Sequence, residues 1–366
     1  MKPVILFESY PDFSGSPLEI YNELIRRGYD KKYDLIWAVY STFNEKTNYK
    51  VVKFHGCNSP EKQEILARTK VIIDSNRYIY KPRPDVFRLH TRHGCSFKKC
   101  LSYYAGVGPV DAILTTSEQM KAVDEIVWPS YLKGKFIVSG LPALDALFSK
   151  IDLNKIGFIK HLTGTDKRYS KIIGWLPTFR KHRKIGKLCG KKFPFGLPIL
   201  YTIEAFKKLN DELMKKNVLL LIQMHHAQAK DYQALPKFSN ICFVNEEDKK
   251  TFGLTTHKLM SAFDAMLTDY SAAYHEYIIL NRPIGLTIDD LVEYSRDEGF
   301  CYNYLDWIKG DYIIKLDTLL AFVANVAANK DPSKSNRTES LKKIHSHIDN
   351  KSTERVVKYL IEKAKL

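Results

Sequence analysis

The chain has 366 residues, 45% of them hydrophobic and 27% charged, and 57 Lys and Arg against 41 Asp and Glu give a formal net charge of +16. The length favours two domains, and no apolar run is long enough to span a bilayer, which excludes an integral membrane protein. The six cysteines lack C-x-x-C spacing and the first residues lack the layout of a signal peptide, so we expect a cytoplasmic protein without a disulfide framework or zinc site.

The first part of the chain alternates runs of β-branched residues, which favour buried strands, with amphipathic stretches that begin at a Ser or end at a Gly. Strands are predicted at 2–7, 33–40, 50–54, 71–74, 111–116 and 135–138. Helices are predicted at 18–28, at 59–69, through Tyr103 and Tyr104, after Ser117, and in a short form before Phe148. Such alternation indicates a parallel sheet covered by helices on both faces.

The pattern loosens into a polar, Lys-rich segment at 151–170 and then starts again. Further strands are predicted at 171–179, 218–226, 240–244, 265–270 and 284–288, with helices at 199–217 and 258–264 and another before Pro283. The sequence therefore predicts an α/β fold of two Rossmann-like β/α domains that face a central cleft. We expect domains at 1–155 and 156–340, followed by a C-terminal helix in 341–366 that packs back toward the first domain.

The loop from Leu89 to Cys100 combines two histidines, a glycine and two lysines after a predicted strand. Histidine is the side chain best suited to accept a proton near neutral pH, and a glycine lets the backbone approach a ligand closely. The loop is therefore a candidate for acid–base chemistry. The alternative is a polar loop with incidental histidines.

In the second predicted domain, polar residues recur where strands end. A hydroxyl, a guanidinium, an imidazole and a helix-capping serine are suited to gripping phosphate oxygens, and they are supplied by Thr178, Arg180, His225, Asp269, Tyr270 and Ser271. The chain has no G-x-x-x-x-G-K-[ST] loop, no G-x-G-x-x-G after its first strand and no H-E-x-x-H, which argues against a P-loop enzyme, a nicotinamide dehydrogenase and a zinc protease.

Between Asp166 and Glu204 there is no acidic residue, while ten lysines and arginines fall there. Nucleic acid, an anionic membrane face or a polyanionic substrate could each be the partner of such a segment, and a solvated basic loop is the plainer alternative.

Eight segments in colinear order resemble motifs of the CDP-glycerol glycerophosphotransferase family, which builds teichoic acids and related phosphate-containing capsule polymers. RHGCSFKKC resembles the family's W-H-G-T-P-L-K-K loop, and LTDYSAAYHEYIILNRPIG resembles T-D-Y-S-S-x-x-F-D-Y-x-x-L-x-K-P. The other six are ILFESYPDFSGSP, GLPALDAL, WLPTFR, QMHH, DDLVEYSRDEGFCYNY and DNKSTERVVKYL. The chain departs from the family at Cys95, Ser96, His226, the pair His275 and Glu276, and Lys351.

The resemblance implies a glycosyltransferase B type fold and a phosphotransferase for substituted phosphate groups. A polyol phosphate, from CDP-glycerol or CDP-ribitol, would pass to a hydroxyl of a lipid-linked or glycan acceptor, and CMP would leave. His93 would be the general base, with His90 structural, while His225 and Arg180 would neutralise the pyrophosphate. Further donor-side residues would be Thr178, Asp269, Ser271, Glu276, Thr353 and Arg355. Of these, Glu276 could equally be a structural helix carboxylate. The acceptor-side residues would be Gly94, Lys98 and Lys99.

Positioned cations can take the place of a metal ion in phosphoryl transfer, so we expect neither a metal nor a cofactor. The family works on lipid-linked acceptors, which implies a peripheral position on the inner face of the plasma membrane, with Phe193, Phe195 and Leu197 dipping into the interface. Two alternatives stay open. One is a nucleotide-sugar glycosyltransferase of the same fold, and the other is a basic nucleic-acid-binding protein, although no RNA-binding signature is evident.

Overall fold

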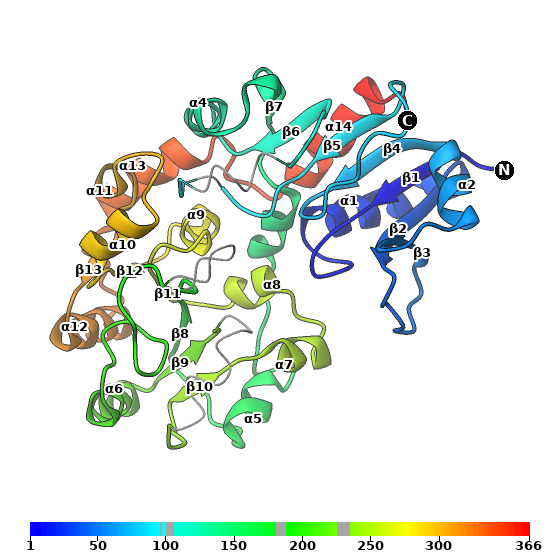
Figure 1. Cartoon of the computed structure of the whole chain (residues 1–366). Coiled ribbons are helices and arrows are strands. Elements are labelled where there is room, and N and C mark those ends of the chain that lie inside the picture. The colour runs from blue at the N-terminus through cyan, green and yellow to red at the C-terminus, as the bar shows by residue number, and fades with distance from the viewer. Residues whose placement is uncertain (96, 100–105, 181–187, 225–234) are drawn as a thin grey trace. The chain divides into compact units, whose positions relative to one another are not determined.

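The computed structural model describes residues 1–95, 97–99, 106–180, 188–224 and 235–366 (Figure 1). The chain forms two compact units. The first consists of Met1–Ser96, Cys100–Ala146 and Ile344–Leu366, and the second of Phe97–Lys99 and Leu147–Lys343. The first unit is therefore assembled from three separate stretches of sequence.

The described residues of the first unit build a seven-stranded sheet in the order β3-β2-β1-β4-β5-β6-β7, in which every pairing is parallel. Its strands are β1 (Val4–Phe7), β2 (Asp34–Tyr40), β3 (Lys50–His55), β4 (Thr69–Asp74), β5 (Phe87–His90), β6 (Ala112–Thr115) and β7 (Phe136–Val138). All four residues of β1 and of β6 are buried, as expected for parallel strands covered on both faces.

The helices of the first unit are α1 (Gly15–Arg26), α2 (Pro60–Arg68), α4 (Glu118–Val127) and α14 (Ser352–Lys363), with 3-10 turns η1 (Tyr29–Lys31) and η2 (Ser130–Leu132). The side chains of Ser59 and Ser117 cap α2 and α4 by accepting the N–H of Lys62 and Met120. The C-terminal helix α14 contacts α1, so the two ends of the chain belong to the same unit (Figure 1).

The described residues of the second unit form a six-stranded parallel sheet in the order β10-β9-β8-β11-β12-β13. Its strands are β8 (Lys171–Leu176), β9 (Val218–Ile222), β10 (Ile241–Phe243), β11 (Ala265–Thr268), β12 (Ile284–Thr287) and β13 (Asp311–Ile313). The helices are α5 (Phe158–Thr163), α6 (Ile203–Lys215), α7 (Glu246–Thr251), α8 (Thr256–Ser261), α9 (Ala273–Tyr277), α10 (Leu291–Asp297), α11 (Tyr304–Trp307), α12 (Leu316–Ala327) and α13 (Lys334–Ile344). The turns η3 (Pro142–Phe148), which crosses the boundary between the units, and η5 (Ile278–Leu280) complete the set.

Helices α6 and α12 contact each other and cover one side of this second sheet. Their apolar side chains, among them Leu209 and Phe322, join Trp175 and Leu220 of the strands in one buried cluster. Close packing also explains the glycine in β8, because a Cβ at Gly174 would lie 2.0 Å from the Phe263 ring.

The two parallel sheets with alternating helices confirm the predicted α/β class. The boundary between the units falls at 146/147 rather than at 155/156. The reason is that the polar segment after Ile151 leads into α5, which contacts β10 and buries Phe158 against Phe252. The helix predicted through Tyr103 and Tyr104 lies outside the described residues.

The prediction that three apolar side chains of the basic segment enter a membrane interface is wrong. Leu197 is 0% exposed within the core of the second unit, and Phe195 packs edge-on against Phe206. Phe193 is 7% exposed and lies beneath the guanidinium of Arg180. These residues stabilise the fold and do not form an interfacial patch. No helix in the described part of the chain is long and apolar enough to cross a membrane.

Candidate active site

Polar residues of the second unit gather at the carboxyl ends of three neighbouring strands. Thr178 and Arg180 follow β8, Asp269 follows β11, and Asp290 follows β12. Because parallel strands end at the same edge of a sheet, the predicted residues Thr178, Arg180 and Asp269 come together there. Asp290 was not predicted, although its position directly after a predicted strand carried the same signal.

Asp269 organises this edge. Its Oδ1 accepts the backbone N–H of Thr178 at 2.8 Å and the Thr178 hydroxyl at 2.6 Å, and its Oδ2 lies 2.9 Å from Nη2 of Arg180. Asp269 is 1% exposed, so these contacts replace the hydrogen bonds that its carboxylate would make to water. The hydroxyl of Thr178 is thus already used as a donor to Asp269.

The guanidinium of Arg180 is held between two carboxylates and a set of rings. Nη2 also lies 3.1 Å from Oδ1 of Asp290, and the guanidinium carbon is 4.8 Å from the ring centre of Tyr270 and 5.0 Å from that of Tyr294. Burial works against its charge, but Asp269 and Asp290 outweigh burial and raise the pKa of Arg180. Its Nε and Nη1 are buried and have no hydrogen-bond partner among the described residues, so two donors are left for a ligand.

Lys98 lies in the second unit, beside this cluster. An isolated antiparallel bridge joins it to Phe300, and the preceding Phe97 packs on the ring of His275. Burial lowers the pKa of Lys98 to about 8, and the nearby carboxylates of Asp269 and Glu298 only partly offset this effect. The prediction put Lys98 and the exposed Lys99 on the acceptor side of the first domain, whereas the structure groups both with the second unit.

Two further predicted residues lie on the segment that follows β11. Ser271 accepts the N–H of Ala273 with its hydroxyl at 3.3 Å, as expected for a serine at a helix start. Glu276 on α9 lies 3.1 Å from Nε2 of His257 on α8, so its carboxylate makes a contact between two helices, and its role at the donor stays a prediction. His225, predicted to be catalytic, lies outside the described residues, as does the adjacent His226.

In the first unit, buried ion pairs surround the end of β5. Asp74 is 0% exposed and binds Arg88 at 2.8 Å and Nδ1 of His90 at 2.7 Å. Burial lowers the pKa of His90 despite this carboxylate, and its ring packs against Tyr78 and Trp128. His90 therefore has the structural place that was expected for it.

His93 follows two anchored residues and is exposed. Thr91 donates its N–H and its hydroxyl to the carbonyl of Asp74, at 2.7 and 3.0 Å. Arg92 has a positive φ of 63° and binds the buried Asp124 at 2.5 Å. Gly94 follows with φ 130°, a conformation that other residues rarely adopt. An accessible imidazole directly after two anchored residues is suited to acid–base chemistry, and the role of His93 as the general base stays a prediction.

At the end of β1, Glu8 is fully buried and accepts the backbone N–H groups of Ser75 and Asn76 at 3.2 and 3.1 Å. Burial, with the negative charge of Asp74, raises the pKa of Glu8 to about 7. The predicted site set did not include this residue.

The predicted phosphate donors Thr353 and Arg355 belong to the first unit and are engaged within it. The N–H of Thr353 donates to Asp145 at 2.8 Å, so a carboxylate already occupies the N-terminus of α14. Arg355 binds Asp349 with both terminal nitrogens, at 2.9 and 3.0 Å, and donates Nε to the carbonyl of Ser139. A phosphate role for the pair stays a prediction and has to compete with these contacts.

The second unit thus offers cations and unpaired N–H donors at a strand edge, and the first unit offers an accessible imidazole on an anchored loop. The groups of the second unit are suited to phosphate binding, and the imidazole of the first unit is suited to proton removal. Among the described His, Cys, Asp and Glu residues, no group of three or more is placed to hold a metal ion.

A model of the CDP-glycerol:poly(glycerophosphate) glycerophosphotransferase family matches residues 1–362. The chain is 26% identical over 330 residues to a teichoic acid poly(glycerol phosphate) polymerase of Bacillus spizizenii, covering 82% of this chain and 78% of that protein. It is 25% identical over 379 residues to the teichoic acid ribitol-phosphate polymerase TarL of Staphylococcus aureus, covering 96% of this chain and 61% of TarL. A poly(ribitol-phosphate) polymerase of B. spizizenii, 25% identical over 228 residues, is matched over 62% of this chain and only 33% of its own length.

Solved structures share the fold. A variant of the wall teichoic acid polymerase TagF superposes with a TM-score of 0.75 at 17% identity, covering 99% of this chain and 89% of that one. A UDP-N-acetylglucosamine 2-epimerase assigned to Listeria monocytogenes superposes with a TM-score of 0.54 at 11% identity, covering 100% and 97%. The same fold thus occurs in proteins with different activities.

Proposed function

The chain belongs to the CDP-glycerol:poly(glycerophosphate) glycerophosphotransferase family, and we propose on that basis that it transfers a polyol phosphate, glycerol phosphate or ribitol phosphate, from a CDP-alcohol to an acceptor hydroxyl. CMP is the leaving group, and the acceptor is a lipid-linked or glycan intermediate of teichoic acid or capsule polymer synthesis. The observation that carries this proposal is the family match over 1–362, which includes both units.

The reaction exchanges one bond at phosphorus. The acceptor oxygen bonds to the phosphorus nearest the polyol, the bond from that phosphorus to the oxygen shared with CMP breaks, and the hydroxyl proton must be removed. We assign proton removal to His93, because it is an accessible imidazole directly after the anchored residues Thr91 and Arg92.

Charge neutralisation of the pyrophosphate is assigned to Arg180 and Lys98. Arg180 has a fixed orientation and two unpaired N–H donors, and Lys98 adds an ammonium group beside Asp269. Asp269 and Asp290 act on the substrate only through Arg180 and are positioning residues. His225 keeps its predicted place among the phosphate-binding residues, and these cations take the role that a divalent metal has in many phosphoryl transfers.

We further propose that the enzyme associates peripherally with the anionic inner face of the membrane. Support comes from the net charge of +16, since basic residues near such a surface contribute about 1 kcal/mol each. The attraction is electrostatic, because the three apolar side chains of the basic segment are packed into the fold. Sedimentation with anionic and with neutral vesicles tests it, and equal binding to both would contradict it.

A donor screen tests the activity. The purified chain is incubated with CDP-glycerol, CDP-ribitol, UDP-sugars and GDP-sugars, each with and without a glycerol phosphate acceptor, and the released nucleotide is identified. Acceptor-dependent release of CMP is expected. Release of UDP or GDP instead would identify a glycosyltransferase of the same fold and refute the proposal.

A further inference from the structure

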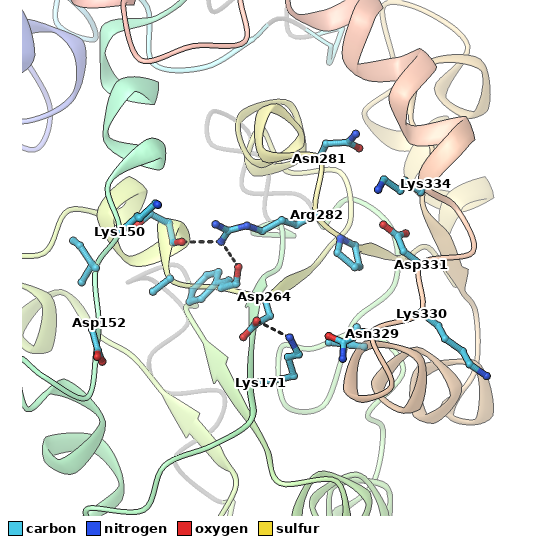
Figure 2. Close-up of a pocket in the computed structure, with 16 residues that line it drawn as sticks. Lys150, Asp152, Lys171, Asp264, Asn281, Arg282, Asn329, Lys330, Asp331 and Lys334 are labelled. Carbon is cyan, nitrogen blue, oxygen red and sulfur yellow. Dashed lines mark hydrogen bonds and ion pairs between the residues drawn. The ribbon is translucent and has the colours of Figure 1, made fainter.

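The second unit has a cavity on the side of its sheet opposite to Arg180. Its volume is about 690 Å³, which lies in the range of small-molecule sites, and it is lined where strands begin rather than where they end. Lys171 opens β8, Asp264 directly precedes β11, and Arg282 lies two residues before β12 (Figure 2). The rest of the wall comes from 150–152, from 261–263, from Asn281 and Pro283, from Val326 of α12 and 329–331 after it, and from Lys334 on α13.

The carboxylates of this cavity are already occupied. Asp264 binds Lys171 at 3.1 Å and accepts the N–H of Ile172 at 2.8 Å. Asp331 receives two nitrogens of the buried Arg337, one at 2.9 Å. Asp152 accepts the backbone N–H groups at 154 and 155, at 2.9 and 3.1 Å. The negative charges in the wall therefore have partners of their own.

Most of the positively charged side chains in the described wall, in contrast, have no carboxylate partner. Nη1 of Arg282 donates to the carbonyls of Ser261 and Phe263, at 2.7 and 2.6 Å, which fixes the guanidinium without neutralising it (Figure 2). In the described part of the chain no carboxylate pairs with Arg282, nor with the exposed Lys150, Lys330 and Lys334. The rigid guanidinium of Arg282 and the ammonium groups of Lys150, Lys330 and Lys334 thus outnumber the one carboxylate of the described wall that has no cationic partner, that of Asp152. Such a site attracts an anion, and a planar guanidinium favours phosphate oxygens.

The residues that line the cavity also exclude some classes of anionic ligand. Phe263 is the one aromatic residue of the wall and is 1% exposed, so a nucleotide base would find no ring face for stacking. The exposed lining residues are polar or charged, and none of the exposed large apolar side chains of the described chain belongs to the wall. The cavity therefore has no apolar side chain that could insert into a lipid surface. A hydrophilic phosphate ester fits both conditions.

We propose that this cavity is a second anion site, which binds phosphodiester groups of the polyol phosphate chain away from the donor cluster. The identity of the ligand rests on the proposed function, since a polyol phosphate chain carries a negative charge on every unit and is the acceptor or product there. A chain held at this cavity stays with the enzyme between transfers.

The test measures binding of phosphodiester-linked glycerol phosphate oligomers to the full chain by calorimetry, at low and at high salt. The double variant Lys150→Glu/Lys334→Glu is compared with Lys207→Glu/Lys208→Glu, which makes the same change of net charge on exposed lysines of α6 outside the cavity. We expect the cavity variant to bind oligomers at least about tenfold more weakly at low salt, and the control to bind within about twofold of wild type. The difference should shrink at high salt, and CMP release with free glycerol phosphate as acceptor should be unchanged in both variants.

Equal oligomer affinity in the two variants would overturn the site, as would a cavity variant that loses binding to anionic vesicles while its oligomer binding is intact. Saturation of the cavity by inorganic phosphate, with no gain in affinity from monomer to oligomer, would also refute a chain-binding role. Oligomer binding that depends on the cavity, in a protein that releases no CMP from any CDP-alcohol, would refute the proposed activity and leave the anion site standing.

Discussion

Replacement of Lys98 by Met should make the protein more stable at neutral pH. Burial lowers the pKa of Lys98 from 10.5 to about 8, and this gap corresponds to roughly 3 kcal/mol at about 1.36 kcal/mol per pKa unit. The folded state binds fewer protons than the unfolded state between these two pH values, so the free energy of unfolding rises with pH there. Below about pH 8 the charged ammonium group lowers the free energy of unfolding by the full roughly 3 kcal/mol. Met removes this destabilisation and keeps a side chain of similar length.

Differential scanning calorimetry measures the effect. At pH 7 the melting temperature of Lys98→Met should rise by roughly 6–12 °C, at about 2–4 °C per kcal/mol for a unit of this size. The gain should shrink as the pH rises from 8 to 10.5. The matched control is Lys99→Met, which changes the exposed neighbour and should leave the melting temperature nearly unchanged.

The same substitution should weaken binding of the donor. The ammonium group lies beside Asp269 and Arg180, where we place the pyrophosphate, and a charged hydrogen bond contributes about 1.5–3 kcal/mol, which is tenfold or more in Kd. The affinity of the wild type for CDP-glycerol should fall above about pH 8 as Lys98 loses its proton, and that of Lys98→Met should not change there. A variant that melts lower at pH 7, or that binds CDP-glycerol as tightly as wild type, would refute the reasoning.

His93→Ala should lower kcat by about 10²–10⁴-fold and leave CDP-glycerol affinity within about twofold, and a variant with full acceptor-dependent CMP release would remove His93 from its role. Glu8→Gln should abolish the loss of stability between pH 4.5 and about 7, because a carboxyl whose pKa is raised in the folded state stabilises the fold only while it is protonated. The gain in the free energy of unfolding above pH 7 should be about 3 kcal/mol by denaturant titration, and an unchanged pH profile would contradict it. Asp145→Asn should cost about 1 kcal/mol of stability through the cap of α14, and tighter donor binding in this variant would show that the N–H of Thr353 is a phosphate ligand after all. Exhaustive treatment with EDTA should leave the rate of CMP release unchanged, and a loss that Mg²⁺ restores would refute metal independence.

Local sequence predicted many of the elements, because a run such as that at Val71 to Asp74 fits a strand buried on both faces, but it missed the long helices α12 and α13. It did not predict β5, which has four residues and places Arg88 and His90 in the interior, where Asp74 balances them. Nor did it predict β13, three residues long, whose first residue is charged. Short strands with polar residues carry no periodic signal, so only tertiary partners reveal them.

Prediction of the site residues from local sequence was limited in the same way, because some of their contacts are made only in the folded chain. Strand-end position correctly grouped Thr178, Arg180 and Asp269. Lys98 was assigned by its closeness in sequence to His93, yet a single antiparallel bridge to Phe300 carries it into the other unit. The apolar residues of the basic segment were judged by their neighbouring lysines, and only packing beneath Arg180 and onto the core reveals that they are interior.

The discontinuous first unit has a consequence for synthesis on the ribosome. Everything that the second unit needs has been translated by Lys343, whereas the first unit lacks α14, and with it the helix that Asp145 caps, until residue 363 has emerged. The unit that begins first is thus completed last, and during translation α1 exposes the surface that later contacts α14. A premature stop between Lys343 and α14 would leave a complete second unit joined to a first unit that lacks its C-terminal helix.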